Sequence, residues 1–236
     1  MVKTSPLSRW LALAATCFGL CGAVQTATAQ EGDIRAKAVT AGELALLPEW
    51  CVDTQDGPYG GPEGGEGLNR SPRARQWVSA MGTDFWNMHH YCRGLRDMLR
   101  LQRAGLSKLD TEMLTGRAIN EFEYIISTCK STMPLMPEVY LKKGEMHLMR
   151  NELPAASQAL EISRKLKPDY WPAYDRWVAA LIGLKQYDRA RALAQEGLGY
   201  IPNQPNLTAR LAAINAAAGR GSSPRVSAAA ASRPGR

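Results

Sequence analysis

The spacing of apolar residues predicts a chain built from helices. Between residues 71 and 135, apolar side chains recur every three or four positions, which is the period of a helix face that packs on a core. The first such stripe consists of Phe85, Met88, Cys92, Leu95 and Leu99, and the second consists of Leu114, Ala118, Phe122, Ile125 and Cys129. We therefore expect two antiparallel helices in this part of the chain.

Polar residues, glycine and proline mark where these helices begin and end. Ser71, followed by proline, is typical of a helix start, and Thr83 is expected to cap the helix again after an interruption at 81–83. Gly105 suits the end of the first helix. Ser107 or Asp110 would then open the second helix.

The next part of the chain contains one helical pattern twice. The two copies read PEVYLKKGEMHLMRNELPAASQALEISRKLKP and WPAYDRWVAALIGLKQYDRARALAQEGLGYIP, and each has two apolar stripes separated by a short polar turn. Pro168 and Pro202, which end the copies, lie 34 residues apart, and Pro134 precedes Pro168 by the same interval. After Pro202, an alanine-rich helix is expected over 206–218.

The two copies resemble the tetratricopeptide repeat over roughly a third of the chain. The residues that carry the resemblance fill the family's aromatic, small and proline positions: Tyr140, Gly144, Ala156, Leu160 and Pro168, then Tyr174, Trp177, Leu181, Ala190, Ala194, Gly197 and Pro202. Lys143 and Val178 depart from the pattern. The resemblance implies an all-α solenoid of antiparallel helix-pair repeats. Its parts would be a degenerate first repeat at 71–135, repeats at 136–169 and 170–203, and a capping helix at 204–218.

In this family, the first helices of successive pairs line a groove that binds a partner. Carried over by position, the groove residues would be Glu138, Leu141, Glu145, Leu148, Met149, Asp175, Ala179 and Ile182. This mixture of apolar and acidic side chains suits a helix or an extended peptide with apolar anchors and some positive charge. Alternatively, the chain's own segment 38–52 fills the groove, because apolar surface is rarely left bare.

Residues 1–29 have the features of a secretory signal peptide. Lys3 and Arg9 give a positive start, the apolar run 10–24 is short for a membrane span, and Ala27-Thr28-Ala29 matches a cleavage site. An uncleaved anchor and a lipoprotein signal at Cys17 or Cys21 are the alternatives. The expected location is the bacterial periplasm or the outside of the cell, with no transmembrane span after cleavage.

The formal net charge of +7, from 29 basic and 22 acidic residues, changes this picture little. Much of the excess lies in the signal peptide and in the Ala/Ser/Pro/Gly-rich tail 219–236, which we expect to be disordered. We therefore expect no nucleic-acid partner. The tail is expected to act as a solubilising segment, and weak contact with an anionic surface is the alternative.

Three cysteines follow the signal peptide, in a compartment where disulfides form. On the expected antiparallel helices, Cys92 and Cys129 are out of step by about nine residues, roughly 13 Å along the axis. A disulfide requires Cα atoms within about 7 Å. Cys51 lies in the N-terminal segment 30–70, which also contains the Gly/Pro-rich loop 57–67, and it can reach either partner. We predict a Cys51–Cys92 disulfide with Cys129 as a buried free thiol, and Cys51–Cys129 as the alternative.

A metal site is the competing hypothesis for the same residues. His89 and Cys92 share a helix face, and Cys51 would supply a third ligand of the kind that zinc or copper accepts. The set has no fourth ligand and no C-x-x-C pair, so we expect neither a metal nor another cofactor.

No catalytic motif is present: the chain lacks G-x-S-x-G, H-E-x-x-H and P-loop patterns. We therefore expect a non-catalytic scaffold or adaptor that binds another envelope protein or peptide. One alternative is a metal-binding or redox protein that uses the cysteine and histidine set. Another is a structural subunit that assembles with copies of itself.

Overall fold

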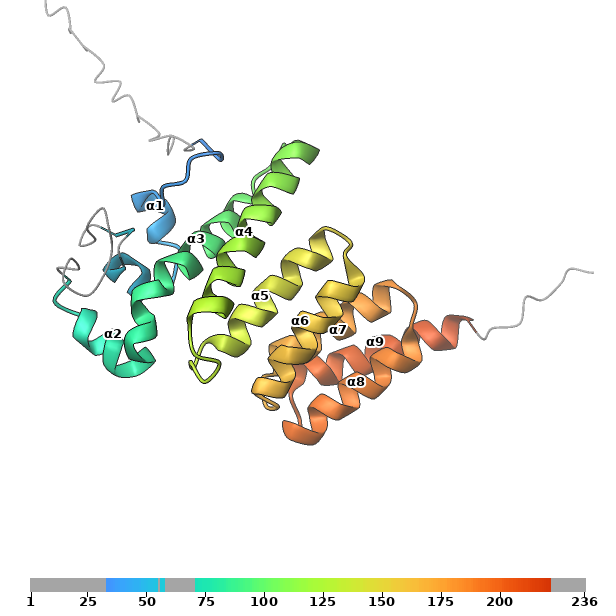
Figure 1. Cartoon of the computed structure of the whole chain (residues 1–236). Coiled ribbons are helices and arrows are strands. Elements are labelled where there is room, and N and C mark those ends of the chain that lie inside the picture. Colours follow the sequence, from blue (N-terminus) through green and yellow to red (C-terminus); the bar gives the residue numbers. More distant parts are fainter. Residues whose placement is uncertain (1–32, 55, 58–70, 222–236) are drawn as a thin grey trace, which may run out of the picture. The chain divides into compact units, whose positions relative to one another are not determined.

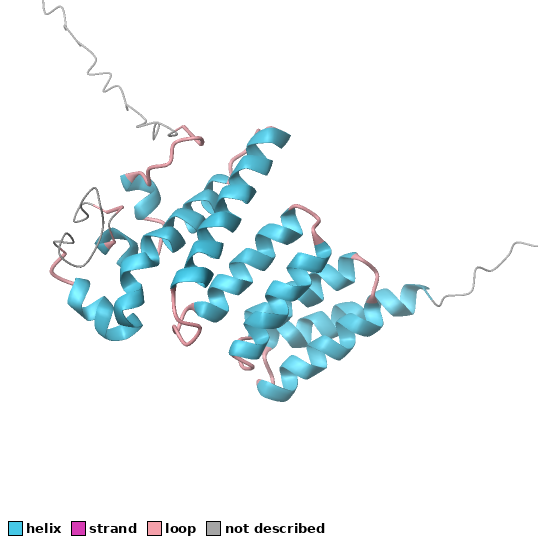
Figure 2. Ribbon diagram, in the orientation of Figure 1, coloured by secondary structure: helices cyan, strands magenta, loops and turns pink. Residues whose placement is uncertain are grey.

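The computed structural model describes residues 33–54, 56–57 and 71–221. Every regular element among them is a helix, and these residues contain no strand (Figure 2), which confirms the all-α prediction for this part of the chain. The α-helices are α1 (Ala41–Leu44), α2 (Ala74–Met81), α3 (Met88–Arg100), α4 (Lys108–Thr128), α5 (Met136–Met149), α6 (Leu153–Leu166), α7 (Trp171–Gly183), α8 (Tyr187–Tyr200) and α9 (Pro205–Gly221). Two short 3₁₀ helices are η1 (Glu49–Asp53) and η2 (Gly82–Asn87).

From α3 onwards, consecutive helices pack in pairs, and each pair packs on the next (Figure 1). The pairs are α3 with α4, α5 with α6, and α7 with α8, and α9 covers the last pair. In addition, α5 contacts α7 and α7 contacts α9, so the first helix of one pair meets the first helix of the next. Each pair therefore buries its apolar face against a neighbour, as stacked helix pairs must.

Small residues allow the close approach between helices. A Cβ atom added at Gly144 on α5 would lie 2.8 Å from Leu160 Cγ on α6. One added at Gly197 on α8 would lie 2.7 Å from Leu207 Cδ1 on α9. Both distances are shorter than side chains tolerate, so these glycines set the separation of their helices.

The apolar stripe of α4 is buried as predicted, with Leu114, Ala118, Phe122 and Ile125 inaccessible to solvent. The predicted burial of the apolar stripe on the preceding helix is confirmed only in part. Phe85, Met88 and Cys92 are buried, whereas Leu95 and Leu99 are only partly buried, although Leu95 packs against the core. Arg96, Asp97 and Arg100 are fully buried. Apolar spacing therefore located the helix and misplaced the buried face of its second half.

The helix ends combine confirmed and corrected predictions. Ser107 caps α4, because its hydroxyl accepts a hydrogen bond from the Asp110 N–H. Ser71 does not cap α2: the helix begins at Ala74, and the Ser71 hydroxyl donates to the buried Asp53 carboxylate instead. Thr83 likewise caps nothing, because η2 begins one residue earlier without a side-chain cap. The tertiary hydrogen bond to Asp53 accompanies a local one, because the Ser71 hydroxyl oxygen also accepts from the Arg73 N–H at 3.2 Å, just before the helix begins.

The last helix is longer than predicted. It extends to Gly221, so the first three residues of the expected tail 219–236 are helical. Adding residues to an existing helix avoids the free-energy cost of forming a first helical turn, which favours this continuation. The predicted signal peptide at 1–29, most of the predicted loop 57–67 and the rest of the predicted tail lie outside the described residues. Among the residues that are described, no helix is long and apolar enough to cross a membrane.

Candidate functional site

A pocket of about 370 Å³ lies where the first helices of three successive pairs meet. We call it the first-helix pocket. Its wall is largely apolar and comes from the C-terminal end of α3, from α5 and from α7: Met98, Leu101, Gln102, Glu145, Met146, Leu148, Met149 and Arg176. Three of these residues, Glu145, Leu148 and Met149, belong to the groove predicted from the sequence.

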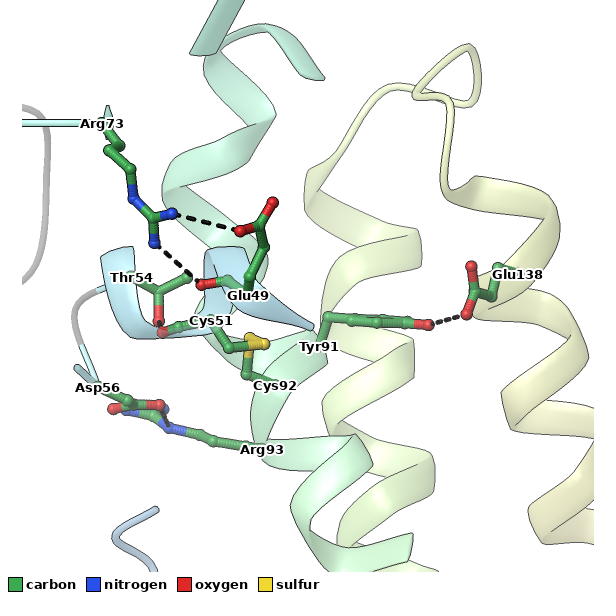
Figure 3. The surroundings of a disulfide bond; sticks show 9 residues. All are labelled: Glu49, Cys51, Thr54, Asp56, Arg73, Tyr91, Cys92, Arg93 and Glu138. Atoms are coloured by element: carbon green, nitrogen blue, oxygen red, sulfur yellow. Dashed lines mark hydrogen bonds and ion pairs between the residues drawn. A yellow bond between two sulfur atoms is a disulfide. The ribbon is translucent and has the colours of Figure 1, made fainter. Parts of the chain in front are cut away.

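Three predicted groove acids are occupied by contacts within the chain. Tyr91 Oη on α3 donates a hydrogen bond of 2.7 Å to Glu138 on α5 (Figure 3). Arg176 Nε on α7 donates one of 2.6 Å to Glu145 on α5, and Arg210 Nε on α9 donates one of 2.7 Å to Asp175 on α7. The first two contacts join the first helix of one pair to the first helix of the next, and the third joins α7 to the covering helix α9. These acids therefore stabilise the stacking, and they do not offer free negative charge to a partner.

Other groove predictions need correction. Leu141 is buried in the core cluster that α5 shares with α6, α7 and α8, so neighbouring helices cover it. Ala179 and Ile182 are half-buried on α7, and neither lines the first-helix pocket. Position within the repeat pattern pointed to α5 and α7, and both helices contribute to the first-helix pocket, while inter-helix packing decides which of their residues remain accessible.

The N-terminal segment does not fill this pocket. No residue of 38–52 contributes to its wall. The segment packs on α3 at a different place, where the Trp50 ring stacks on the Tyr91 ring at 5.7 Å and Leu44 packs beside Cys51 and Cys92. The alternative in which this segment occupies the groove is therefore wrong for the first-helix pocket.

The structure joins Cys51 to Cys92, the pair expected from the sequence, with Cα atoms 5.8 Å apart (Figure 3). Cys51 lies on η1 and Cys92 on α3, and both are inaccessible to solvent. Cys129 is a buried free thiol, and burial raises its pKa. The disulfide therefore ties the N-terminal segment to α3.

The metal-binding alternative loses its ligands in this arrangement. Cys51 and Cys92 are bonded to each other, and His89 Nδ1 lies 3.0 Å from the Trp86 carbonyl oxygen. Within the described part of the chain, no three His, Cys, Asp or Glu side chains form a group that could hold a metal ion. The neighbouring His90 lies 2.6 Å from Glu121 and stacks on Tyr124.

His89 makes the stability of the fold depend on pH. Burial, followed by the nearby positive charges of His90 and Arg93, lowers the pKa of His89 to about 4. An unfolded chain would titrate near the ordinary value of about 6.5, so the unfolded state binds more protons between these two pH values. The contribution of the neutral His89 side chain to the free energy of unfolding is therefore complete above pH 6.5 and is lost as the pH falls towards 4.

We expect the His89→Gln variant to lose less stability on acidification than the parent protein. The difference between the two proteins should be about 1–3 kcal/mol, because one pKa unit corresponds to about 1.4 kcal/mol and the ring keeps some contact with water. Urea titrations at pH 7 and pH 4.5 would measure it. An equal loss in both proteins would show that other groups cause the acid sensitivity.

Sequence reasoning missed a network of buried charges beside the disulfide. Arg100 Nε donates a 2.6 Å hydrogen bond to Glu43, and its other N–H groups donate to the carbonyl oxygens of Ile34, Ala36 and Ala38. Arg96 donates to Asp97 at 2.9 Å and to the Lys37 carbonyl oxygen. Arg96 and Arg100 are only 1% exposed. Their spacing of four residues places both on one face of α3, and this spacing was the one signal available in the sequence.

Comparison of the chain with protein-family models, with curated proteins and with solved structures found no match. The features of this chain that bear on its function are the first-helix pocket, the disulfide and the buried charges.

Proposed function

We propose that this chain is a non-catalytic scaffold of tetratricopeptide-like repeats that binds another protein of the bacterial cell envelope through the first-helix pocket. The observation that carries the proposal is the composition of this pocket. Helices α3, α5 and α7, each the first of its pair, contribute to one largely apolar wall. An accessible apolar hollow of this kind suits side chains from a partner helix or an extended peptide.

The repeat geometry supports the tetratricopeptide-like part of the proposal. Asn151 and Lys185 lie two residues beyond the ends of α5 and α7, respectively, and each has a φ of 58°, in the left-handed region. They lie 34 residues apart, so the chain turns in the same way at the same place in both copies. Pro154 lies in the first turn of α6, the second helix of the first copy, where the absence of an N–H group is tolerated.

The proposed location outside the cytoplasm is supported by the buried disulfide. Such bonds form and persist in oxidising compartments and are rare in the cytosol. The features of residues 1–29 agree with export to the periplasm or beyond it.

The partner is expected to bring apolar anchors and does not need positive charge. Glu145 is already paired with Arg176 and with Lys142, so its carboxylate contributes little attraction. Met149 is 51% exposed at the edge of the first-helix pocket. It provides the flexible, polarisable contact typical of surfaces that accept varied apolar side chains.

The proposal is tested by placing a photoreactive amino acid at position 149 and, as a control, at position 166 in the producing cells. Leu166 is 39% exposed on α6 and does not line the pocket. We expect a crosslink to one discrete envelope protein at position 149 and none at position 166. The same crosslinks at both positions would contradict the proposal, and a crosslink to a second copy of the chain would support the self-assembling alternative.

With the partner identified, we expect Met149→Glu to weaken its binding by at least about tenfold, because the complex would bury a carboxylate without a partner. Leu166→Glu, the matched control, should leave the affinity within about twofold, as substitutions outside a contact surface do. Isothermal titration with the purified proteins would measure both. Equal effects of the two variants would show that the pocket is not the binding surface.

A further inference from the structure

A second and more polar pocket, of about 470 Å³, lies between the N-terminal segment and the first helix pair. Its wall includes Lys37, Ala38 and Asp56 from the N-terminal segment, Arg93 and Arg96 from α3, and Arg117, Asn120 and Glu121 from α4. The first-helix pocket shares none of these residues. We call it the arginine pocket, and any function it has is separate from the scaffold function proposed above.

Positive charge is in excess behind this wall. Asp97 is inaccessible to solvent and accepts hydrogen bonds from Arg96 and Arg117, while Arg100 lies 3.9 Å from it. The second buried acid, Glu43, serves Arg100 and Arg103. The guanidinium groups of Arg96, Arg100 and Arg117 thus share these two carboxylates. Backbone carbonyl oxygens supply the remaining acceptors, but they carry no full charge.

The acids on the pocket wall do not restore the balance. Asp56 is held by two hydrogen bonds from Arg93, at 2.6 and 2.7 Å (Figure 3). Glu121 lies 2.6 Å from His90, and the positive charges of Lys37, Arg93, Arg96 and Arg117 on the same wall outnumber the negative charges of Asp56 and Glu121. Of these positive side chains, that of Lys37 is exposed. The pocket therefore presents a positive field, which a bound anion would neutralise.

The guanidinium groups are also fixed in position before any ligand arrives. Arg117 donates to Asp97 through two of its nitrogens and to the Arg35 carbonyl oxygen through the third. These contacts use three of its five N–H donors within the described part of the chain. Donors held in this way lose little conformational entropy when they bind a carboxylate or a phosphate.

From these observations we propose that the arginine pocket binds a small molecule with anionic oxygen groups, either carboxylate or phosphate. Arg117, Arg93 and Lys37 would contact the ligand, and Arg96 would contribute charge from behind. The volume suits a molecule of ordinary metabolite size and is too small for a folded partner. Carboxylate and phosphate both present anionic oxygen atoms, so the pocket alone does not tell them apart. The titration below compares ligands of the two classes.

The test is isothermal titration of the full chain, with its disulfide intact, at constant ionic strength. The probes are citrate for carboxylates, inorganic phosphate and glycerol phosphate for phosphates, and chloride as the reference anion. We expect saturable one-to-one binding of citrate or of a phosphate probe at concentrations where chloride has no effect. The tighter of the two classes identifies the natural ligand chemistry.

Arg117→Gln should weaken that binding by about tenfold or more, because one charge-assisted contact is lost. Arg103→Gln is the matched control: the two side chains are 21% and 22% exposed and each pairs with an acid of the same network, but Arg103 does not line the pocket. It should leave the affinity within about threefold, since only distant charge is removed. If Arg117→Gln fails to fold, Lys37→Gln serves in its place and should weaken binding in the same direction.

Three results would overturn the proposal. The first is the absence of saturable binding for all probes. The second is an equal loss of affinity in the pocket variant and in Arg103→Gln, which would indicate a general charge effect. The third is binding that both pocket variants leave unchanged, which would place the anion elsewhere on the chain.

Discussion

Replacing Asp97 with alanine is expected to lower the free energy of unfolding by about 3–5 kcal/mol, because it leaves buried guanidinium groups without their shared carboxylate. Arg96 and Arg117 donate to this acid directly, and neither it nor Arg96 is accessible to water. The same arginines hold the N-terminal segment through its carbonyl oxygens, so the segment should also detach. Urea titration followed by circular dichroism would measure the stability, and amide hydrogen exchange would show which residues detach.

Asp188→Ala provides the matched control, because Asp188 also pairs with an arginine, Arg191 at 3.0 Å, but its side chain is 99% exposed. Exposed pairs contribute at most about 1 kcal/mol, so this variant should be nearly neutral. If Asp97→Ala lowers the free energy of unfolding by no more than the control does, water must reach the buried charges around Asp97. The less disruptive Asp97→Asn variant should still show most of the loss in unfolding free energy expected for Asp97→Ala, because it removes the charge while keeping the shape of the side chain.

Removing the disulfide with Cys51→Ala and Cys92→Ala together should cost about 4 kcal/mol. The bond spans a sequence separation of 41 residues, and the chain-entropy relation for a loop of that length gives about 4 kcal/mol at 25 °C. The two cysteines are also fully buried, so reduction should require partial opening of the N-terminal segment. Urea titration of the double variant against the parent protein would measure the loss.

Cys129→Ala is the control for this experiment, because it removes a buried sulfur without breaking a bond. A loss of about 1 kcal/mol is expected, as for the deletion of a small buried group. In the protein cleaved after Ala29, which lacks Cys17 and Cys21, thiol alkylation under denaturing, non-reducing conditions should find one reactive cysteine before this substitution and none after it. A double variant no less stable than Cys129→Ala would show that the disulfide contributes nothing beyond the packing of its sulfur atoms.

The first-helix pocket shows how far position in the sequence can carry a site prediction. Leu148 and Met149 were expected in the groove and line the pocket, whereas Leu141 was expected there and lies in the core. Met98 and Leu101 were not anticipated as groove residues. They come from the helix pair whose repeat pattern is least regular, so no position in the family pattern pointed to them.

The sequence by itself determined the local features of this protein. Apolar spacing located the helices, as the buried stripe of Leu114, Ala118 and Phe122 shows, and Ser107 marked a helix start correctly. Helix rise and disulfide geometry also excluded the Cys92–Cys129 pair, which left Cys92 or Cys129 as the partner of Cys51, and the structure joins Cys51 to Cys92. These features depend on neighbours a few residues apart, or on geometry that is the same in every helix.

Only the tertiary structure decided which polar residues are buried. Arg100, whose charged side chain is of a type that is seldom fully buried, is buried because Glu43, 57 positions away, and the carbonyl oxygens of the N-terminal segment surround it. Burying a guanidinium group is tolerable only when such partners are in place. Their arrangement depends on how the N-terminal segment meets α3, and no local pattern in the sequence encodes that contact.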